Sequence, residues 1–535
     1  MNKLAGWFII FLSLSVLVYA CTNYYFRENY RDVNSMLTSM KESENKVYLK
    51  AHLRNGDVVI FKKAWTLDSL SKSISGNAIR YDYNRELRED GEIVISTDSV
   101  IIYETNKSMA WSEDGRKSTI MFLAGLNAAV TGFCIISPKT CFGSCPTFYI
   151  DENDNFHYAD AEGFSSAILP SLEYEDVDAL NSSKLNDYID ENFIDITLKN
   201  EALETHCIRS VSLLGYPVKN NQKVFHSNND KFYLTENTYL PDKATSNNND
   251  ITKLLKYDDR KEWLSLSDEK NLISKEEIIL KFDSIDNSDN LGLNIHFRQS
   301  LMTTFLFYNT MSYMGDEFSD YFALLEREPV IMEKLNNGLK KELGNIDIYV
   351  WNASKQNWIY QAGLNEQGPI SINRQFVKLK DYSGNNNVRI KLVLNKALWR
   401  IDYTSLCNVI SEVKPYEMTP KEIRKDGKTD YQSLSKLLTK DDYLITSPGE
   451  SYKLRFEVPT GEQRYEYFLK SKGYYLEWMR ESWLEGKNIA KLYMLLEQPK
   501  LYLKSVAKDF KSYESQMEAD FWNSKIQNER VIYDK

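Results

Sequence analysis

Ile278-Ile279-Leu280-Lys281-Phe282 and Leu291-Gly292-Leu293-Asn294-Ile295-His296-Phe297 are two short runs in which apolar side chains occupy every second position. Alternation with a period of two predicts a β-strand with one buried face and one polar face. We therefore expect Leu293 and Phe297 to point into a core. His296 falls on the opposite face and is expected to face solvent. The two runs predict that a β-sheet is the central feature of the chain.

The residues around these two strands indicate a sandwich with a helix inserted into it. The apolar run 301–314 is long enough for a helix and too short to cross a membrane. Polar Asn395-Lys396 is expected to be the turn of a hairpin. We expect further strands at four places, namely 346–351, 358–361, 388–394 and 398–403. Strands on both sides of a helical insertion predict one β-sandwich-like domain over 262–410.

The N-terminal part has the pattern of a small antiparallel β module over 21–117. Val47–Leu53 and Val58–Phe61 read as strands, and Asn55-Gly56 between them is a strong signal for a tight hairpin turn. The module is expected to end before the apolar segment 118–140.

The segment 118–140 contains a second long apolar run, Ile120–Ile136, which carries no charge. Gly125, Asn127 and the marginal length of the run weaken a transmembrane interpretation. We therefore expect a buried or membrane-surface helical segment, with a membrane span as the alternative.

Two more regions complete the predicted organisation. The region 141–255 contains a hairpin, and its polar stretch Ser246–Asp250 is the clearest linker candidate. The region 411–535 is expected to hold strands, an aromatic run that forms core, and an amphipathic helix. The apolar side chains of that helix recur every three or four positions at Leu503, Val506, Phe510, Tyr513, Met517 and Phe521.

The composition bounds the fold class and the partners. The chain has 535 residues and a net charge of −10, with acidic and basic residues mixed along its length. Nucleic-acid binding needs clustered Lys and Arg, so no nucleic-acid partner is expected. Abundant Tyr together with β-branched residues favours strands. The patterns together predict a fold that is mainly β with α insertions (α+β).

Residues 1–20 have the layout of a bacterial lipoprotein signal peptide. Lys3 precedes an apolar core, and the small residue Ala20 stands directly before Cys21. The signal departs from the usual pattern at Tyr19, where a small residue is typical. An uncleaved membrane anchor and cleavage without lipidation are the alternatives.

The expected lipidation site, Cys21, places the protein in the bacterial cell envelope, anchored to a membrane by its N-terminal lipid. No acidic run follows the cysteine. This favours the outer membrane, with the protein facing the periplasm.

The remaining cysteines predict a disulfide. Outside the cytoplasm a bond between Cys141 and Cys145 is favoured, with Cys134 as another partner and free structural thiols as the alternative. Metal binding is not expected, because Cys-x-x-x-Cys lacks a second ligand pair nearby. The acidic turn 151–155 also lacks the glycine and the distal glutamate of a calcium loop.

The run Cys141-Phe142-Gly143-Ser144-Cys145-Pro146-Thr147-Phe148-Tyr149 supports the same location. Behind a lipoprotein signal, it resembles a motif of uncharacterised envelope lipoproteins of the Bacteroidota type. The resemblance is confined to this motif and its surroundings. It implies a place in the cell envelope and no particular activity.

Common enzyme motifs do not occur in the sequence. It contains no His-Glu-x-x-His, Gly-x-Ser-x-Gly or paired Cys-x-x-Cys. Neighbouring His206 and Cys207 point to opposite faces of a strand, and no flanking group is expected to orient either of them, which argues against a catalytic dyad. No residue is assigned to catalysis, a cofactor or a metal.

The expected function is therefore non-catalytic binding or scaffolding, with an envelope protein or a glycan as the partner. The alternative is a carbohydrate-binding protein, or a carbohydrate-active enzyme that uses two carboxylates.

Overall fold

The computed structural model describes residues 24–30, 33–40, 49–53, 57–81, 87–109, 145–150, 158–168, 172–201, 204–227, 229–283, 285–286, 290–315, 338–365, 368–382, 386–439, 442–446, 450–459, 463–477 and 486–527. They belong to two compact units. Unit 1 comprises Met1–Val130 and Met479–Gly486, and unit 2 comprises Thr131–Trp478 and Lys487–Lys535. The leader 1–20, Cys21, the apolar segment 118–140 and Cys141 lie outside the described residues, so what the sequence predicts for them stays a prediction.

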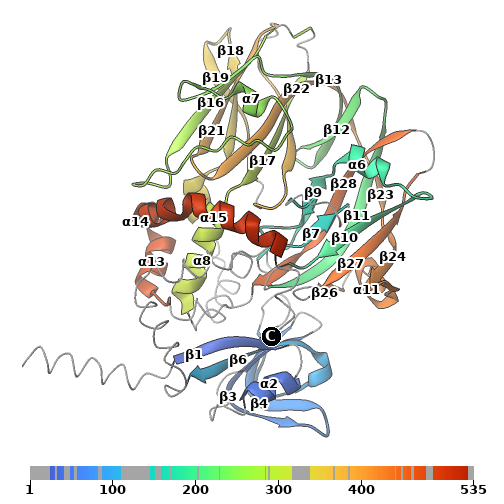
Figure 1. Cartoon of the computed structure of the whole chain (residues 1–535), viewed down its shortest axis with the longest axis vertical. Helices are drawn as coiled ribbons and strands as arrows, with labels where there is room; N and C mark the ends of the chain where they lie inside the picture. Colours follow the sequence, from blue (N-terminus) through green and yellow to red (C-terminus); the bar gives the residue numbers. More distant parts are fainter. Residues whose placement is uncertain are drawn as a thin grey trace, which may run out of the picture. The chain divides into compact units, whose positions relative to one another are not determined.

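Unit 1 is an antiparallel sheet with a helix packed on it (Figure 1). Its described strands follow the order β1-β6-β2-β3-β4-β5. Their bounds are β1 Tyr24–Tyr30, β2 Leu49–Leu53, β3 Val58–Asp68, β4 Ser73–Tyr81, β5 Leu87–Ser96 and β6 Val100–Met109, with η1 Thr97–Ser99 and α2 Val33–Met40. Met36 of α2 joins Phe61, Trp65 and Tyr103 in one apolar core. The N-terminal antiparallel β module is confirmed.

Two sheets of unit 2 are built from strands far apart in the sequence. One has the order β25-β24-β27-β10-β7-β8 and the other β23-β11-β28-β9, with β26 also paired to β11. Their bounds are β7 Thr147–Tyr149, β8 Ala161–Glu162, β9 Tyr174–Ala179, β10 Phe193–Lys199, β11 Glu204–Val218, β23 Tyr416–Met418, β24 Pro420–Lys425, β25 Lys428–Thr429, β26 Leu444–Thr446, β27 Ser451–Glu457 and β28 Arg464–Glu477. Because β10 pairs with β27 and β11 with β28, the regions 141–255 and 411–535 share both sheets.

A closed barrel lies beside these sheets in unit 2, with the strand order β12-β13-β22-β17-β20. Its strands are β12 Gln222–Ser227, β13 Lys231–Tyr239, β17 Leu291–Gln299, β20 Asn373–Lys378 and β22 Trp399–Val413. The barrel closes where β12 meets β20 in parallel, at Ser227 and Phe376. Leu293 and Phe297 of β17 are fully buried, as their alternation predicts.

The last sheet of unit 2 has the order β15-β14-β16-β21-β18-β19. Its strands are β14 Lys243–Ser246, β15 Asn249–Asp250, β16 Lys275–Phe282, β18 Ile346–Asn352, β19 Asn357–Leu364 and β21 Val388–Asn395. Ile278, Leu280 and Phe282 of β16 are buried, whereas Lys275 and Lys281 are exposed. This sheet therefore has one core face and one solvent-facing side.

The expected hairpin at Asn395-Lys396 is wrong. β21 pairs with β16 and β18, whereas β22 pairs with β17 and β13, so the chain passes from one sheet to another. The passage is held by hydrogen bonds from the amide of Lys396 to the carbonyl of Ser274 and from the amide of Ala397 to the carbonyl of Ser265. Contacts made by a distant segment thus replace the local pairing.

The linker predicted at Ser246–Asp250 is also wrong, because this stretch is the hairpin of β14 and β15. Asn247 and Asn248 have φ angles of 48° and 69°. Asparagine tolerates this left-handed region, and two such residues in succession form the tight turn that matches the twist of paired strands. A polar composition fits a turn as well as a linker.

The C-terminal helices of unit 2 pack together with a helix from the middle of the chain (Figure 1). The helices of unit 2 are α6 Ser182–Asp187, α7 Thr252–Leu255, α8 Met302–Met314, α11 Tyr431–Leu438, α13 Ile489–Glu497, α14 Pro499–Ser505 and α15 Ala507–Gln527. Phe510 of α15 is buried against Phe305 of α8. The described fold is mainly β with α insertions, as the sequence predicts.

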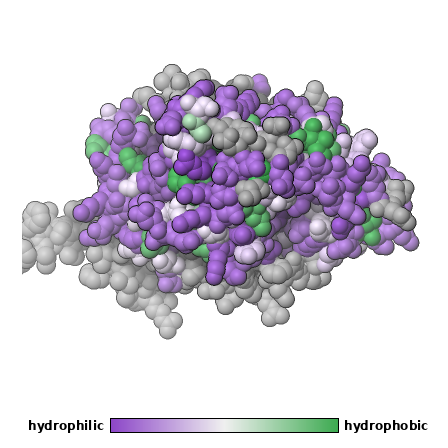
Figure 2. All heavy atoms as spheres, turned by 90° about the horizontal axis from the view of Figure 1, so that it is seen from above, coloured by the Kyte–Doolittle hydropathy of each residue, from purple (hydrophilic) through white to green (hydrophobic). Residues whose placement is uncertain are grey.

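The face of the molecule in Figure 2 is mainly hydrophilic, and hydrophobic residues appear on it as small separate spots. A large apolar interaction surface is therefore not a feature of that face. A recess with a partly apolar lining is present in unit 2.

Candidate functional site

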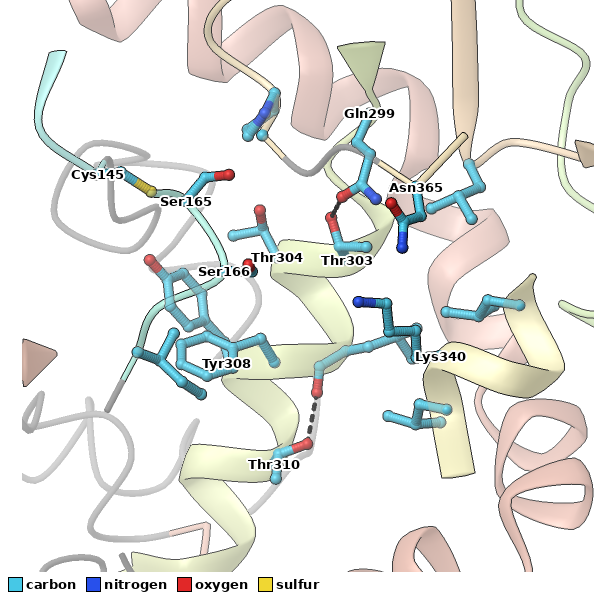
Figure 3. A pocket seen from close by; sticks show the side chains of 18 of the residues that line it. Cys145, Ser165, Ser166, Gln299, Thr303, Thr304, Tyr308, Thr310, Lys340 and Asn365 are labelled. Atoms are coloured by element: carbon cyan, nitrogen blue, oxygen red, sulfur yellow. Dashed lines mark hydrogen bonds between the residues drawn. The ribbon is translucent and has the colours of Figure 1, made fainter. Parts of the chain in front are cut away.

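A pocket of about 630 Å³ lies beside α8 in unit 2 (Figure 3). A volume in this range is typical of sites for small ligands. The wall combines α8 with the ends of several strands, including Gln299 of β17, Trp399 of β22 and Tyr475 of β28. Segments from distant parts of the sequence thus meet around one recess.

The helix α8 has two apolar faces, and each has a different partner. Thr303, Phe307 and Met311 line the pocket. On the other side, Phe305 contacts Phe510 and Tyr313 contacts Tyr502, with ring centroids 5.3 Å and 6.1 Å apart. The pocket and the contacts with α14 and α15 thus involve different residues of α8.

The start of α8 is fixed by a polar contact at the pocket. The hydroxyl of Thr303 donates to the side-chain oxygen of Gln299 at 2.9 Å (Figure 3). Figure 3 shows Asn365 and Lys340 across the pocket from Cys145 and Ser165. Lys340 is exposed, so a positive charge stands at the edge of the pocket.

Three buried glutamates line the deeper part of the pocket. Glu162, Glu204 and Glu477 are 3%, 0% and 5% exposed, respectively. The amides of Ile370 and Ser371 donate to one oxygen of Glu162 at 2.9 Å and 3.2 Å. Three carboxyl groups thus line the same pocket, and those of Glu162 and Glu204 are held by hydrogen bonds.

Glu204 also orients a histidine behind the pocket. His206 Nε2 lies 2.8 Å from Glu204 Oε1, and both side chains are fully buried. The two residues are two positions apart on β11, so they share a face of the strand. The expectation that no group orients His206 is wrong, because the partner lies on the same strand. Cys207 lies on the opposite face of the strand and is buried.

Cys145 is buried in the pocket wall and forms no disulfide with another described cysteine. Burial raises its pKa well above the ordinary value, and the nearby carboxylates of Glu162 and Glu204 raise it further. A thiol with a raised pKa is a weak nucleophile at neutral pH. Cys141 lies outside the described residues, so the disulfide between the two stays a prediction.

A second cluster of titratable groups lies on the barrel. His296 Nδ1 is 3.4 Å from Asp258 Oδ2, and Arg374 Nη2 is 3.9 Å from the same oxygen. The sequence predicts that His296 faces solvent, and this is wrong, since it is 5% exposed. His296 shares a face of β17 with Gly292, which is packed against Phe376 in the apolar cluster formed by the other barrel strands. This face therefore points into the closed barrel.

Burial also sets the protonation of this cluster. It lowers the pKa of His296 to about 4. It raises the pKa of Asp402 to about 8, and the Asp258 carboxylate adds to this effect. For Asp258 burial acts in the upward direction, but His296 and Arg374 outweigh it and lower the pKa. Asp402 therefore holds a proton at neutral pH while Asp258 is ionised. Asp402 is fully buried, so this proton is part of the barrel interior.

Comparison with known proteins does not assign the chain to a family. No family model matches the chain, and no curated protein matches its sequence significantly. Within the described ranges, no three His, Cys, Asp or Glu side chains are grouped so that they could hold a metal ion. None of the helices in the described part of the chain is long and apolar enough to cross a membrane.

Sequence reasoning missed the pocket almost completely. The sequence points to Cys145 for a different role, and it places Tyr475 in an aromatic run and the residues of α8 in a helix without indicating a pocket. The carboxylates of Glu162, Glu204 and Glu477 come from β8, β11 and β28, and no local spacing links them. One usable signal existed, because Glu204 and His206 are two positions apart and therefore share a face of a strand.

Proposed function

We propose that this is a lipid-anchored protein of the bacterial cell envelope that binds an amphipathic ligand in the pocket of unit 2 without transforming it. The observation that carries the proposal is the division of the pocket into an apolar wall and an acidic end. Ligand pockets are typically apolar with a few polar groups that fix orientation. The anchor and the location rest on the leader sequence and Cys21.

The chemistry of the pocket selects the ligand. The wall formed by Phe307, Met311 and Trp399 suits an alkyl chain or a ring. The buried carboxylates Glu204 and Glu477 favour a cationic or hydrogen-bond-donating end. The ligand class is thus an apolar body that carries an amine, which includes the N-terminus of an apolar peptide segment.

The charge preference can be tested with three probes of the same chain length. Octylamine, octanol and octanoate are titrated into the full-length protein by calorimetry. We expect octylamine to bind at least about tenfold more tightly than octanol, because one compensated charge is worth about 1.4 kcal/mol or more. Octanoate is expected to bind most weakly. Equal affinities for the three probes would contradict the proposal that carboxylates at one end of the pocket select the amine.

Substitutions in the pocket wall test whether the ligand binds there. Thr304→Trp places a large side chain in the pocket wall and is expected to abolish binding, whereas Thr439→Trp, at an exposed position after α11, leaves it unchanged. Glu477→Gln should reduce the preference for the amine, and the exposed Glu457→Gln serves as its matched control. Retained octylamine binding in a folded Thr304→Trp protein would refute the site.

A further inference from the structure

The solvent-facing side of the β15-β14-β16-β21-β18-β19 sheet carries four aromatic rings in a two-by-two arrangement. Tyr349 pairs directly with Tyr360 and Trp351 with Trp358 across β18 and β19. The ring centroids are 5.5 Å and 5.4 Å apart, and the planes cross at 69° and 67°. Tyr360 is 54% exposed. We call these four residues the aromatic ladder.

A β-bulge puts the aromatic ladder on one face. The register of β18 and β19 shifts between Ile348 and Tyr349, so that Gln361 is the extra residue of β19. Without it, Tyr360 would oppose Val350 and point into the core, because a one-residue shift exchanges the faces of a strand.

The side chain of Gln361 fixes the bulge. Its amide nitrogen donates to the carbonyl of Lys380 at 3.1 Å, and its oxygen accepts from the amide of Lys380 at 2.7 Å. These bonds substitute for the main-chain pairing that the bulge interrupts. The sheet thus holds an unusual register that turns aromatic rings outward.

Three positively charged residues lie next to the aromatic ladder on the neighbouring strands of the sheet. Lys243 pairs with Lys281 and Lys281 with Arg389, so three cations stand side by side on β14, β16 and β21. All three are exposed, and none is in a described ion pair. Like charges directly opposite each other destabilise a sheet. We call these three residues the basic row.

The aromatic ladder and the basic row are joined through cation–π contacts. Arg389 lies over the ring of Trp351, with its guanidinium carbon 4.7 Å from the centroid. Lys391 lies 5.3 Å from the centroid of Tyr349 and 5.2 Å from that of Trp358. Lys391 is also 3.3 Å from the carboxylate of Glu277, so its charge is compensated, in contrast to the basic row.

We propose that this face binds an anionic polysaccharide, whose sugar rings stack on the aromatic ladder and whose carboxylates contact the basic row. Aromatic faces pack against the apolar faces of sugar rings, and exposed cations supply the complement to acidic sugars. The proposal goes beyond the pocket, since either site can bind without the other.

The surroundings of the aromatic ladder favour a glycan over a nucleic acid. Asp347 and Glu277 flank it on the side away from the basic row, where their carboxyl oxygens can accept hydrogen bonds from the hydroxyls that a sugar carries and that a phosphodiester backbone of DNA lacks. The protein as a whole carries a net charge of −10. The basic row is therefore a local feature.

Affinity electrophoresis and calorimetry of the full-length protein test the proposal with polygalacturonate, neutral dextran and single-stranded DNA as probes. We expect polygalacturonate to bind at least about tenfold more tightly than either comparison polymer. Trp351→Ala combined with Trp358→Ala, and separately Lys281→Gln combined with Arg389→Gln, should each weaken binding on the order of tenfold.

Matched controls keep the test specific. Tyr416→Ala with Tyr431→Ala removes two exposed rings elsewhere in unit 2, and Lys421→Gln with Lys428→Gln removes two exposed cations. Both controls should bind polygalacturonate like the wild type, as should the pocket variant Thr304→Trp. The proposal is overturned if polygalacturonate does not bind, if dextran or DNA binds equally well, or if the folded ladder variant binds unchanged.

Discussion

Asp402 is the residue at which burial and charge conflict most strongly. In the pairing of β17 with β22, His296 opposes Tyr403 and Phe297 opposes Ile401, so Asp402 is an unpaired bulge residue. It is fully buried, and neither oxygen has a hydrogen-bond partner among the described residues. Burial therefore favours its protonated form, which explains the raised pKa.

This predicts a pH-dependent stability that Asp402→Asn removes. The carboxyl has a pKa of about 8 in the folded protein and about 3.9 in the unfolded chain, so its stabilising contribution is complete below pH 4 and is lost as the pH rises to 8. As the pH rises from 4 to 8, the free energy of unfolding of the variant should therefore increase by roughly 1–3 kcal/mol relative to that of the wild type. Urea unfolding at pH 5 and pH 8 measures the gain. The exposed Asp283→Asn is the control, and a gain that does not change with pH would contradict the assignment.

At the same scale, the sequence predicts burial better than it predicts contacts. The alternation of Leu293 and Phe297 correctly predicts buried positions, since a strand exposes its two faces in turn. The same pattern fails for His296, because the second face of β17 points into the closed barrel and is buried there as well. Residue periodicity reports one face of a strand and cannot report what covers the other.

At the scale of elements, the barrel depends on close packing at Gly292. A Cβ at this position would lie 2.0 Å from Cζ of Phe376, which is fully buried on the adjacent strand β20. Either Phe376 or the two strands would have to move.

We therefore expect Gly292→Ala to destabilise unit 2 by about 2 kcal/mol or more, since overpacking of a well-packed core has costs of this size. Chemical denaturation of the full-length protein measures the change. Gly338→Ala is the matched control, because a Cβ there meets no atom within 4 Å. Equal stability of the two variants would show that β17 and β20 are less tightly packed than the structure indicates.

The sequence predicts helices and strands well where they follow from a local pattern. It predicts strand pairing poorly where the partners are distant in the sequence. The strands β16 to β18 and the helix α8 follow from alternation and from an apolar run of helical length. The hairpin expected at Asn395-Lys396 failed because β21 and β22 find partners in different sheets. The turn at Asn247 and Asn248 was mistaken for a linker because asparagine is common in both.

At the scale of the whole molecule, the candidate site depends on contacts between distant segments. β11 and β28 pair over nearly their full length although about 260 residues separate them in the sequence. Their ends bring Glu204 and Glu477 to the pocket. No spacing rule predicts such a meeting, so the pocket became visible only in the folded chain.

The anchor is a property of the whole protein, and Cys21 tests it. We expect metabolic labelling with a fatty acid to mark the wild-type protein in bacterial envelopes. Cys21→Ala should lose the label and leave the membrane fraction. Cys145→Ala is the control and should retain both. Label that persists in Cys21→Ala would refute lipidation at this residue, and membrane association without any label would favour an uncleaved anchor.

The central claim is that the recess beside α8 is a binding site for an amphipathic amine, and photo-crosslinking tests it most directly. A diazirine-bearing octylamine is irradiated with the full-length protein, and the labelled peptides are identified by mass spectrometry. We predict label on residues 302–314 and around Trp399, competed by excess octylamine and absent from Thr304→Trp. Label scattered over other peptides, or equal labelling of the Thr304→Trp protein, would contradict the account.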